Sequence, residues 1–226
     1  MPRLLVNLLA MFIPNKASRR EFRIKMLPTH SITINDNGVG NKVVAYGHCG
    51  NKHINIYGDN NLVQIDTKKG FSCTINVGTP DSPASNCVIK VGIDTTSTDT
   101  VSMRVMENGS SIRIGSDCMF SADIFLECSD THAILDMDGK ILNIGESIEV
   151  GDHVWVGQCC KILKNSAVPS NSIVGMNSLV TRRFQDKNCI IAGIPANVVK
   201  RNVCWDRRRP QQYINDAKLS QPSLGS

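Results

Sequence analysis

Histidine has the side chain whose ordinary pKa lies nearest to neutral, so it is the first candidate for moving a proton at physiological pH. The sequence has five histidines, at His30, His48, His53, His132 and His153. His132 alone lies in a polar segment rich in acids, SDTHAILDMDGKILN at residues 129–143. Its ring could be oriented by any of the carboxylates near it in the chain, at Glu127, Asp130, Asp136 and Asp138. We therefore expect general acid–base chemistry at His132, and the alternative is a solvated loop histidine without a role.

Sulfur and metal chemistry are less favoured by the spacing of the residues. The nine cysteines are odd in number, include no C-x-x-C pair and belong to a chain that is not small. We therefore expect buried thiols in a reducing compartment rather than a disulfide framework or a zinc site. His132 and His153 are 21 residues apart with no third histidine after them, and Cys159 and Cys160 adjoin no histidine. We expect neither a metal site nor a cysteine nucleophile.

The residues around these candidates repeat with a strict period of six, here called the six-residue beat. Aliphatic or aromatic residues recur at Ile114, Phe120, Leu126, Val150, Val156, Ile162, Val168, Val174 and Val180. Compact residues precede the later members by two positions, at Val154, Cys160, Ser166, Ser172 and Ser178. The side-chain periods of a helix and of a strand are 3.6 and 2, so neither explains a period of six. A chain that turns a corner every six residues does, and three sides close an eighteen-residue coil of a parallel β-solenoid.

The beat also defines the organisation of the chain. Residues 26–205 form the expected solenoid, with irregular alternating strands between residues 26 and 128; a separate small β domain there is the alternative. Residues 129–143 interrupt the beat as a loop excursion, and such excursions usually form the functional face. Residues 206–226 are expected to form a basic helix followed by a disordered tail.

Composition places the chain among ordinary globular proteins, with 41% hydrophobic and 20% charged residues. The net charge of +5 is concentrated at the ends, since residues 1–25 and 200–226 together carry +9 and the rest carries −4. A nucleic-acid partner is not expected, because the basic groups belong to appendages rather than to the folded body. We expect residues 1–25 to form an amphipathic, basic helix that caps the domain. A peripheral membrane contact and a cleaved signal are the alternatives. The expected location is cytoplasmic, with the inner face of the membrane as a variant.

The motif series resembles the hexapeptide-repeat acyltransferases, and most of all the O-acetyltransferases of sugars and polysaccharides. The resemblance rests on SIEVGDHVWVG at residues 147–157, Ile162-Leu-Lys, SIVGMNSLVTR at 172–182 and IAGIPA at 191–196. It covers residues 112–206. It implies an all-β solenoid, a left-handed parallel β-helix with short N- and C-terminal helices, that assembles as a homotrimer and uses acetyl-CoA as co-substrate.

The resemblance also assigns roles to individual residues. His132 occupies the place of the family's catalytic histidine. Asp130, in the same segment, is expected to line the substrate cleft together with Trp155, which matches a tryptophan that lines the family's donor–acceptor cleft. The family's CoA contacts would fall at Gln158, Met176, Thr181, Arg182 and Lys200. The sequence departs from the usual pattern at Met176, where alanine is common, and at Asn197, which is often basic.

The function implied is acetyl-CoA-dependent O-acetylation of a hydroxyl on a sugar or surface polysaccharide, by direct transfer with histidine as the general base. N-acylation of an amino-sugar is the rival within the same fold. A non-catalytic solenoid that serves as a scaffold or binding subunit is the rival from another class.

Overall fold

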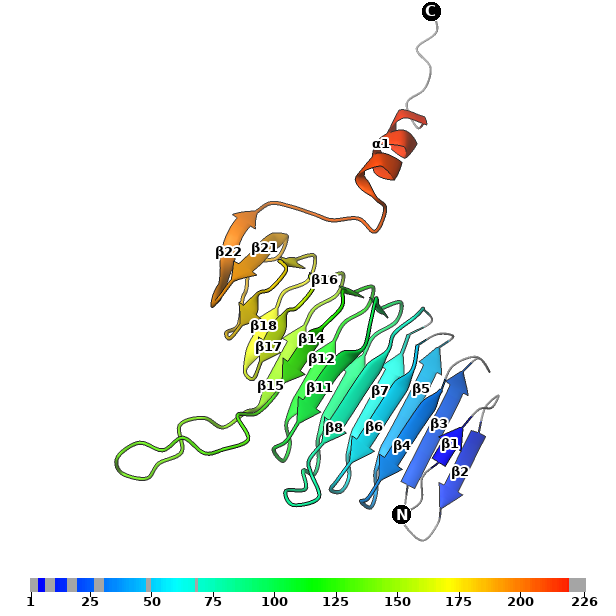
Figure 1. The fold of residues 1–226 in the computed structure, drawn as a ribbon, viewed down its shortest axis with the longest axis vertical. Helices are drawn as coiled ribbons and strands as arrows, with labels where there is room; N and C mark the ends of the chain where they lie inside the picture. The colour runs from blue at the N-terminus through cyan, green and yellow to red at the C-terminus, as the bar shows by residue number, and fades with distance from the viewer. Residues whose placement is uncertain are drawn as a thin grey trace, which may run out of the picture.

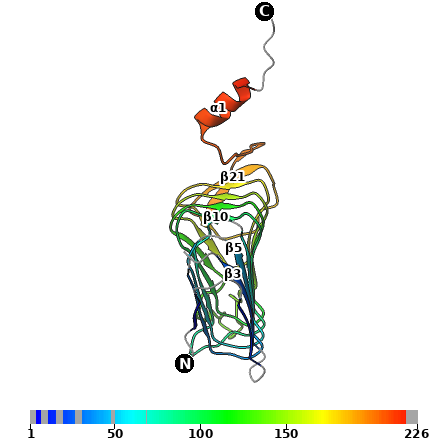
Figure 2. The ribbon, with the colours of Figure 1, turned by 90° about the vertical axis from the view of Figure 1, so that its right-hand side faces the viewer.

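The chain winds into a parallel β-solenoid, seen from the side in Figure 1. The computed structural model describes residues 4–6, 11–15, 20–26, 31–47, 50–67 and 69–219. Three sheets, here called A, B and C, run along the axis of the solenoid, and the strands of successive coils pair in register. In Figure 2 the coils stack along one axis, with β3 toward one end and α1 beyond the other.

The strands of each sheet follow in the order of their pairing. Sheet A contains β1 (Leu4–Val6), β4 (Ile32–Asp36), β6 (Lys52–Ile56), β8 (Cys73–Val77), β11 (Val101–Val105), β14 (Ile124–Glu127), β17 (Lys161–Leu163) and β20 (Leu179–Val180). Sheet B contains β2 (Met11–Asn15), β3 (Arg20–Met26), β5 (Lys42–Gly47), β7 (Leu62–Asp66), β9 (Val88–Val91), β12 (Ser111–Ile114), β15 (Ser147–Val150) and β18 (Ser166–Val168). Sheet C contains β10 (Thr96–Ser97), β13 (Met119–Phe120), β16 (Trp155–Val156), β19 (Ile173–Val174), β21 (Cys189–Gly193) and β22 (Ala196–Arg201).

The six-residue beat becomes three columns of inward side chains, one on each sheet. The sheet A column contains Leu126, Ile162 and Val180, the sheet B column Ile114, Val150 and Val168, and the sheet C column Phe120, Val156 and Val174. All nine are buried. The predicted solenoid is confirmed, and Ile114 pairs directly with Val150 because the loop excursion takes the place of one coil.

Each corner of the regular coils is made by one residue in the left-handed backbone region. These residues stand three positions after a column residue, at Asp117, Asp123, His153, Cys159, Asn165, Asn171 and Asn177. Asparagine and aspartate tolerate positive φ better than other non-glycine residues, which explains their prevalence here. The compact residue that follows the corner is buried in every case from Val154 to Ser178.

The N-terminal half is the same solenoid with longer, flatter coils. Ile34, Ile54 and Ile75 are register partners in sheet A, so these coils take 20 and 21 residues. Sheet C begins only at β10, and the preceding coils run between sheets A and B alone. Because sheets A and B continue without a break into the regular coils, the alternative of a separate small β domain is wrong for the described residues.

The helix predicted for residues 1–25 is wrong in the described part of that range, where β1, β2 and β3 are strands. Phe22 and Ile24 face the core while Arg23 between them does not, which is the period of a strand. β1 and β2 pair antiparallel with β4 and β3, and so they close the open end of the solenoid with short edge strands.

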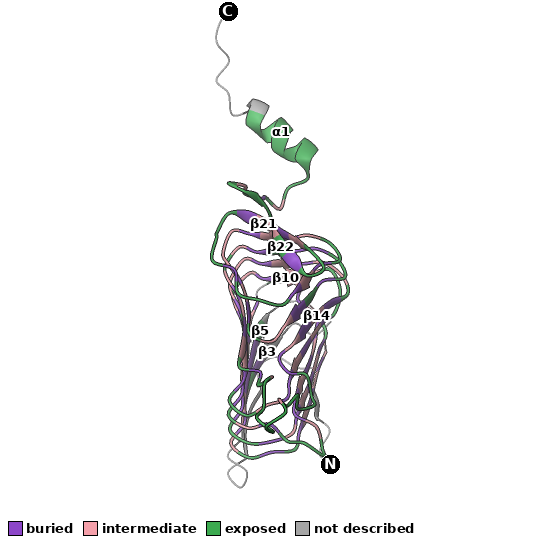
Figure 3. Cartoon of the chain, turned by 90° about the vertical axis from the view of Figure 1, so that its left-hand side faces the viewer, coloured by how far each residue is buried: buried purple, intermediate pink, exposed green. Residues whose placement is uncertain are grey.

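The C-terminal segment carries a helix, as predicted. α1 (Pro210–Leu219) begins with a proline, which is favoured in the first turn because it lacks the N–H that would be left unpaired there. Its exposed surface is green in Figure 3, where it stands beyond the last coil. The predicted disordered tail, residues 220–226, lies outside the described residues. No helix among the described residues is long and apolar enough to cross a membrane.

Candidate active site

The loop excursion leaves the solenoid between β14 and β15 as a projecting arm, drawn in green at the lower left of Figure 1. Its two ends are tied by one carboxylate. Glu107 accepts a hydrogen bond from Ser129 Oγ at 2.6 Å and another from the Gly145 backbone N–H at 2.6 Å. Ser129 Oγ in turn accepts from the Thr131 N–H at 2.8 Å. The arm therefore leaves the body in a fixed direction.

The segment that carries His132 is held by its backbone. The His132 N–H donates to the Asp130 carbonyl at 2.7 Å, and its own carbonyl accepts from Asn143 Nδ2 at 2.8 Å. Asn143 Nδ2 also donates to Asp130 Oδ2 at 2.8 Å, and Lys164 forms an ion pair with the same carboxylate. The hydrogen bonds from Lys164 and Asn143 hold the pKa of Asp130 below its ordinary value. The backbone of His132 is thus positioned while its side chain remains exposed to solvent.

Three of the four carboxylates that could have oriented the ring have other partners, and the fourth, Asp138, is exposed and makes no hydrogen bond to the ring. Asp130 bonds Lys164 and Asn143, and Asp136 accepts from backbone N–H groups in the turn at the tip of the arm. Glu127 pairs with Arg104 at 3.0 Å, and burial nevertheless raises the pKa of Glu127. Among the described residues, none donates to or accepts from the imidazole of His132. Within one chain, therefore, no carboxylate orients the ring.

Although the sequence of the arm is rich in acids, the arm also exposes many apolar side chains. A single antiparallel bridge joins Leu135 to Ile141, and Met137 at the tip is fully exposed. Six large apolar side chains of the arm are exposed, at Ile134, Leu135, Met137, Ile141, Leu142 and Ile144. A concentration of exposed apolar side chains of this kind on a projecting element is typical of a surface that contacts another molecule.

Trp155 stands on sheet C, and two of the predicted CoA contacts lie beside it. Trp155, Gln158 and Met176 line one hollow of about 410 Å³, in which Gln158 and Met176 stand on adjacent coils. Trp155 is 37% exposed and Met176 is 70% exposed. The hollow combines an indole face, a thioether and an amide, which suits an extended ligand with both apolar and amide groups.

The other predicted contacts lie apart from this hollow. Thr181 and Arg182 follow β20 at the end of sheet A, where Arg182 donates to Asn197 Oδ1 at 2.7 Å and covers the ring of Phe184. Lys200 is exposed on β22. Trp155, Gln158 and Met176 are therefore brought together, and Thr181, Arg182 and Lys200 extend the surface toward the last coil without lining the hollow.

His153, next but one to Trp155, is part of a polar and aromatic cluster that holds the C-terminal segment. Its ring stacks on Trp205 with centroids 4.2 Å apart. His153 Nδ1 lies 2.7 Å from Asp117 Oδ2, and Trp205 Nε1 donates to the His153 carbonyl at 2.9 Å. Arg207 pairs with the other oxygen of Asp117 at 2.9 Å. We call His153, Asp117, Trp205 and Arg207 the clamp.

The clamp lowers the pKa of Asp117 and packs near the indole of Trp155. Partial burial alone would raise the pKa of Asp117, but the hydrogen bonds and charges of His153 and Arg207 outweigh it and the pKa lies below the ordinary value. Trp205 also lies 6.2 Å from Trp155, centroid to centroid. A second hollow, of about 750 Å³, opens between the two tryptophans and Tyr213 of α1. The clamp therefore supports the indole of Trp155 from the side of the C-terminal segment.

The topology separates His132 from Trp155 within one chain. The arm leaves at the corner between sheets A and B, whereas Trp155 lies on sheet C, the third face of the prism. A triangular cross-section places that corner opposite sheet C. One chain alone therefore does not bring the candidate base to the candidate cleft.

The chain is similar to known proteins in both sequence and structure. No family model matches the chain. The chain is 31% identical over 181 residues to a polysialic acid O-acetyltransferase of Neisseria meningitidis, covering 72% of this chain and 83% of that protein. The chain belongs to this family of O-acetyltransferases.

Two further relatives agree on the family. A polysialic acid O-acetyltransferase of Escherichia coli O1:K1 / APEC is 35% identical over 130 residues, which are 57% of this chain. The alignment spans 42% of that longer protein. The crystal structure of the polySia-specific acetyltransferase NeuO matches with a TM-score of 0.66 and 26% identity, over 89% of this chain and 92% of that one. The solenoid fold expected from the sequence is thus shared with a polySia-specific acetyltransferase.

The sequence predicts the excursion that the structure shows between β14 and β15, but it does not predict the clamp. The side chain of His153 is only 32% exposed, because the rest of the clamp covers it. Asp117 and Trp205 are 36 and 52 residues away from it in the chain. The signal available in the sequence was the corner position that Asp117 and His153 share, three residues after Ile114 and Val150, which are register partners.

Most cysteines of the described residues are packed in the core of the solenoid. Six of the eight cysteines in the described part of the chain are buried, and burial raises the pKa of Cys118 to about 11 and that of Cys128 to about 12. Cys160, the compact residue of a corner, is among the buried ones. No group of three or more metal-binding side chains occurs among the described residues.

Proposed function

We propose that the chain is an acetyl-CoA-dependent O-acetyltransferase that acts on a hydroxyl of a surface polysaccharide, with His132 as the general base. The family membership supports acetyl transfer to a sugar oxygen, and the names of the relatives point to an acidic polysaccharide as acceptor. The observation that carries the assignment of the base is the exposed imidazole of His132 on a fixed, apolar arm.

The chemistry requires one proton to move twice. The His132 imidazole takes the proton of the acceptor hydroxyl as its oxygen attacks the thioester carbonyl carbon of acetyl-CoA. The tetrahedral intermediate then breaks its C–S bond, and the imidazolium returns the proton to the departing CoA sulfur. The products are the acetyl ester and CoA, with no covalent enzyme intermediate and no metal ion needed in any step.

The site is completed between subunits in this proposal. A homotrimer would lay the apolar arm of one subunit against the neighbour and carry His132 toward the neighbour's Trp155 hollow. The exposed arm and the separation of His132 from Trp155 within one chain both support this assembly. In the trimer, Gln158 and Met176 would contact the pantetheine arm of CoA, and Thr181, Arg182 and Lys200 would face its polar and phosphate groups.

The deciding experiment measures CoA release from acetyl-CoA with a thiol reagent, over a panel of acceptors. We expect turnover with polysialic acid or another acidic polysaccharide and an ester that mild base removes. Turnover only with amino-sugars, giving a base-stable amide, would favour N-acylation. Binding of polysaccharide without any thiol release across the panel would favour a non-catalytic binding subunit.

A further inference from the structure

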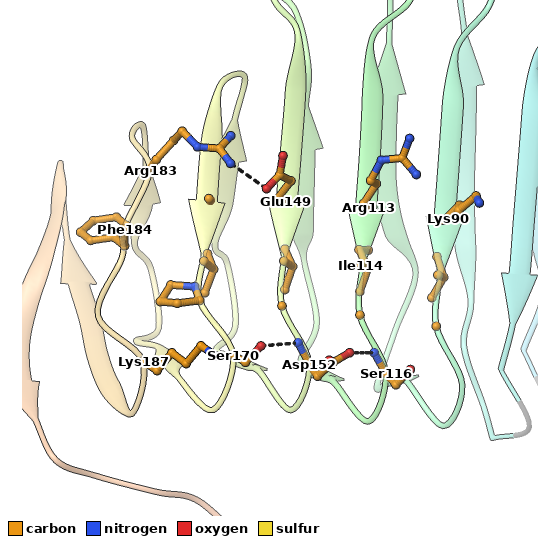
Figure 4. Close-up of a pocket in the computed structure, with 18 of the residues that line it drawn as sticks. Lys90, Arg113, Ile114, Ser116, Glu149, Asp152, Ser170, Arg183, Phe184 and Lys187 are labelled. Atoms are coloured by element: carbon orange, nitrogen blue, oxygen red, sulfur yellow. Dashed lines mark hydrogen bonds and ion pairs between the residues drawn. The ribbon is translucent and has the colours of Figure 1, made fainter.

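A second surface feature lies on the outer face of sheet B, away from the Trp155 hollow. It is a groove of about 680 Å³ that crosses the coils, shown in Figure 4, and its volume lies within the range of roughly 300–1,000 Å³ typical of ligand sites. Its floor includes Gly92, Gly115 and Gly151, one from each of three coils. A Cβ on Gly115 would lie 2.6 Å from the Gly151 carbonyl carbon, so the close stacking of the coils keeps side chains out of this strip.

Two cations stand side by side along the groove. Lys90 and Arg113 are register partners on β9 and β12, and adjacent strands are about 4.8 Å apart. Figure 4 shows both side chains extending from neighbouring strands on the same face. Like charges on directly adjacent strand positions destabilise a sheet. This pair is therefore an arrangement that the fold alone does not favour.

The contrast with sheet A shows that the fold can provide partners for such groups. There, Arg104 is the register partner of Glu127 and the two form an ion pair at 3.0 Å. In sheet B, Glu149 is the register partner of Arg113, yet its carboxylate pairs with Arg183 at 2.6 Å on its other side. Lys90 and Arg113 have no hydrogen-bond or ion-pair partner among the described residues.

The carboxylates of the groove, unlike these cations, are occupied. Asp152 accepts from the Ser116 N–H at 2.7 Å, and Asp66 accepts from Gln64 Nε2 at 2.6 Å. With Glu149 bound by Arg183, each acid that lines the groove has a protein partner. The lining carries four cations, Lys90, Arg113, Arg183 and Lys187, against three carboxylates, so the groove has an excess of one positive charge and is suited to an anion.

We propose that this groove is a binding site for a carboxylate-bearing polysaccharide, separate from the transfer site, with Lys90 and Arg113 as its anion contacts. The ligand is extended because the two cations lie on successive coils along an open groove. Phe184, the aromatic residue of the lining, is buried beneath Arg182 and offers no free face for the adenine of CoA. The proposal rests on the proposed function for the identity of the polymer as the acceptor.

Such a site would make acceptor recognition depend on chain length. A long polymer occupies the groove and the transfer site at once, and two linked contacts raise the effective affinity without new contacts at either site. A short oligomer reaches one site at a time. The KM for a long acidic polymer should therefore be lower than that for a short oligomer of the same sugar.

The test compares K90Q/R113Q with K69Q/K161Q, in which Lys69 and Lys161, two exposed lysines outside the groove, are changed so that the net charge falls equally. Binding is measured by calorimetry with polysialic acid of long and short chain length, with a neutral dextran of similar size and with acetyl-CoA. Since exposed charge contacts contribute modestly, we expect K90Q/R113Q to bind the long polymer about tenfold more weakly, and K69Q/K161Q to bind it like the wild type. Neither variant should alter affinity for dextran or acetyl-CoA.

Each other outcome overturns a stated part of the proposal. Equal loss in both variants would mean non-specific charge attraction, and unchanged polymer binding in K90Q/R113Q would remove the site. Loss of acetyl-CoA affinity in K90Q/R113Q would assign the groove to the phosphates of CoA. Polymer binding that depends on Lys90 and Arg113 in a wild-type protein that releases no CoA would support the groove and contradict the proposed enzyme.

Discussion

At the scale of single residues, the structure distinguishes a side chain that is positioned for chemistry from those that maintain its surroundings. His132 has a fixed backbone and an unpartnered ring, whereas Asp130, Asn143 and Lys164 bond one another at the base of the arm. A ring without a partner in one chain is available to a substrate hydroxyl, which supports its assignment as the base.

Replacing His132 with alanine should therefore remove catalysis without removing the fold. The side chain is exposed and contributes nothing to the core columns. A positioned general base is worth about 10²–10⁴-fold in rate, so kcat for acetyl transfer should fall by that order while acetyl-CoA affinity stays within a few-fold. Steady-state kinetics and calorimetry measure the two quantities. Lys140→Ala, on the same arm, is the control and should retain turnover; near wild-type kcat in His132→Ala would exclude it as the base.

At the corners, single residues are selected by backbone conformation. Asn171 has a φ of 60°, and Asn171→Val should destabilise the fold by about 1–2 kcal/mol because a β-branched residue is strained there. Asn171→Gly keeps the conformation accessible and should change the free energy of unfolding by less than about 1 kcal/mol. Denaturant titration of the two variants checks the difference, and equal stabilities would show that the corner is not restrictive.

At the scale of elements, the regular coils could be predicted from the sequence because each hexad places one apolar residue inward and one compact residue at the corner. Every column residue from Ile114 to Val180 obeys that rule. The end strands could not be predicted in the same way. The apolar run from Leu4 to Ile13 is predicted to be helical, but an apolar run of this length has no decisive period, and pairing of β1 with β4 and of β2 with β3 makes its described residues strands.

The clamp escaped prediction for a related reason. Its members come from three distant parts of the chain. His153 stacks on Trp205, which is 52 residues further along, and a contact between such distant residues produces no repeat in the sequence. Trp205 and Trp155 are the only tryptophans of the protein, so intrinsic fluorescence reports on the clamp and the cleft wall together.

Acid should open the clamp. Because the pKa of Asp117 is lowered by His153 and Arg207, its contribution is complete above the ordinary carboxyl pKa of about 3.9 and is lost as pH falls through the lowered value. We expect a change in tryptophan fluorescence below about pH 4, and Asp117→Asn should show the altered fluorescence already at neutral pH. Asp123→Asn, at the next corner, is the matched control and should behave like the wild type. Identical titration curves for all three proteins would contradict the role of Asp117.

At the scale of the whole molecule, the solenoid is a rigid prism that displays different surfaces on its faces. The apolar arm lies at one corner, the Trp155 hollow on the opposite face, and the basic groove on sheet B. A sequence pattern can predict the prism and locate the arm. It does not show that His132 and Trp155 lie on opposite sides of the prism, because that depends on which corner and face each hexad occupies. This separation gives the trimer its role in the proposed reaction.

A site shared between subunits can be tested by complementation. His132→Ala and Trp155→Ala should each be inactive, yet a mixed trimer contains interfaces at which an intact His132 meets an intact Trp155. In a ring of head-to-tail contacts, every mixed trimer selected through both tags has one such interface, so about one third of its sites should be of this kind. Co-expression with different tags, purification through both tags and the thiol-release assay measure the recovery, and light scattering at micromolar concentration reports the assembly. A site contained in one chain would give no recovery in any mixture. A monodisperse monomer with wild-type turnover would rule out both the trimer and the shared site.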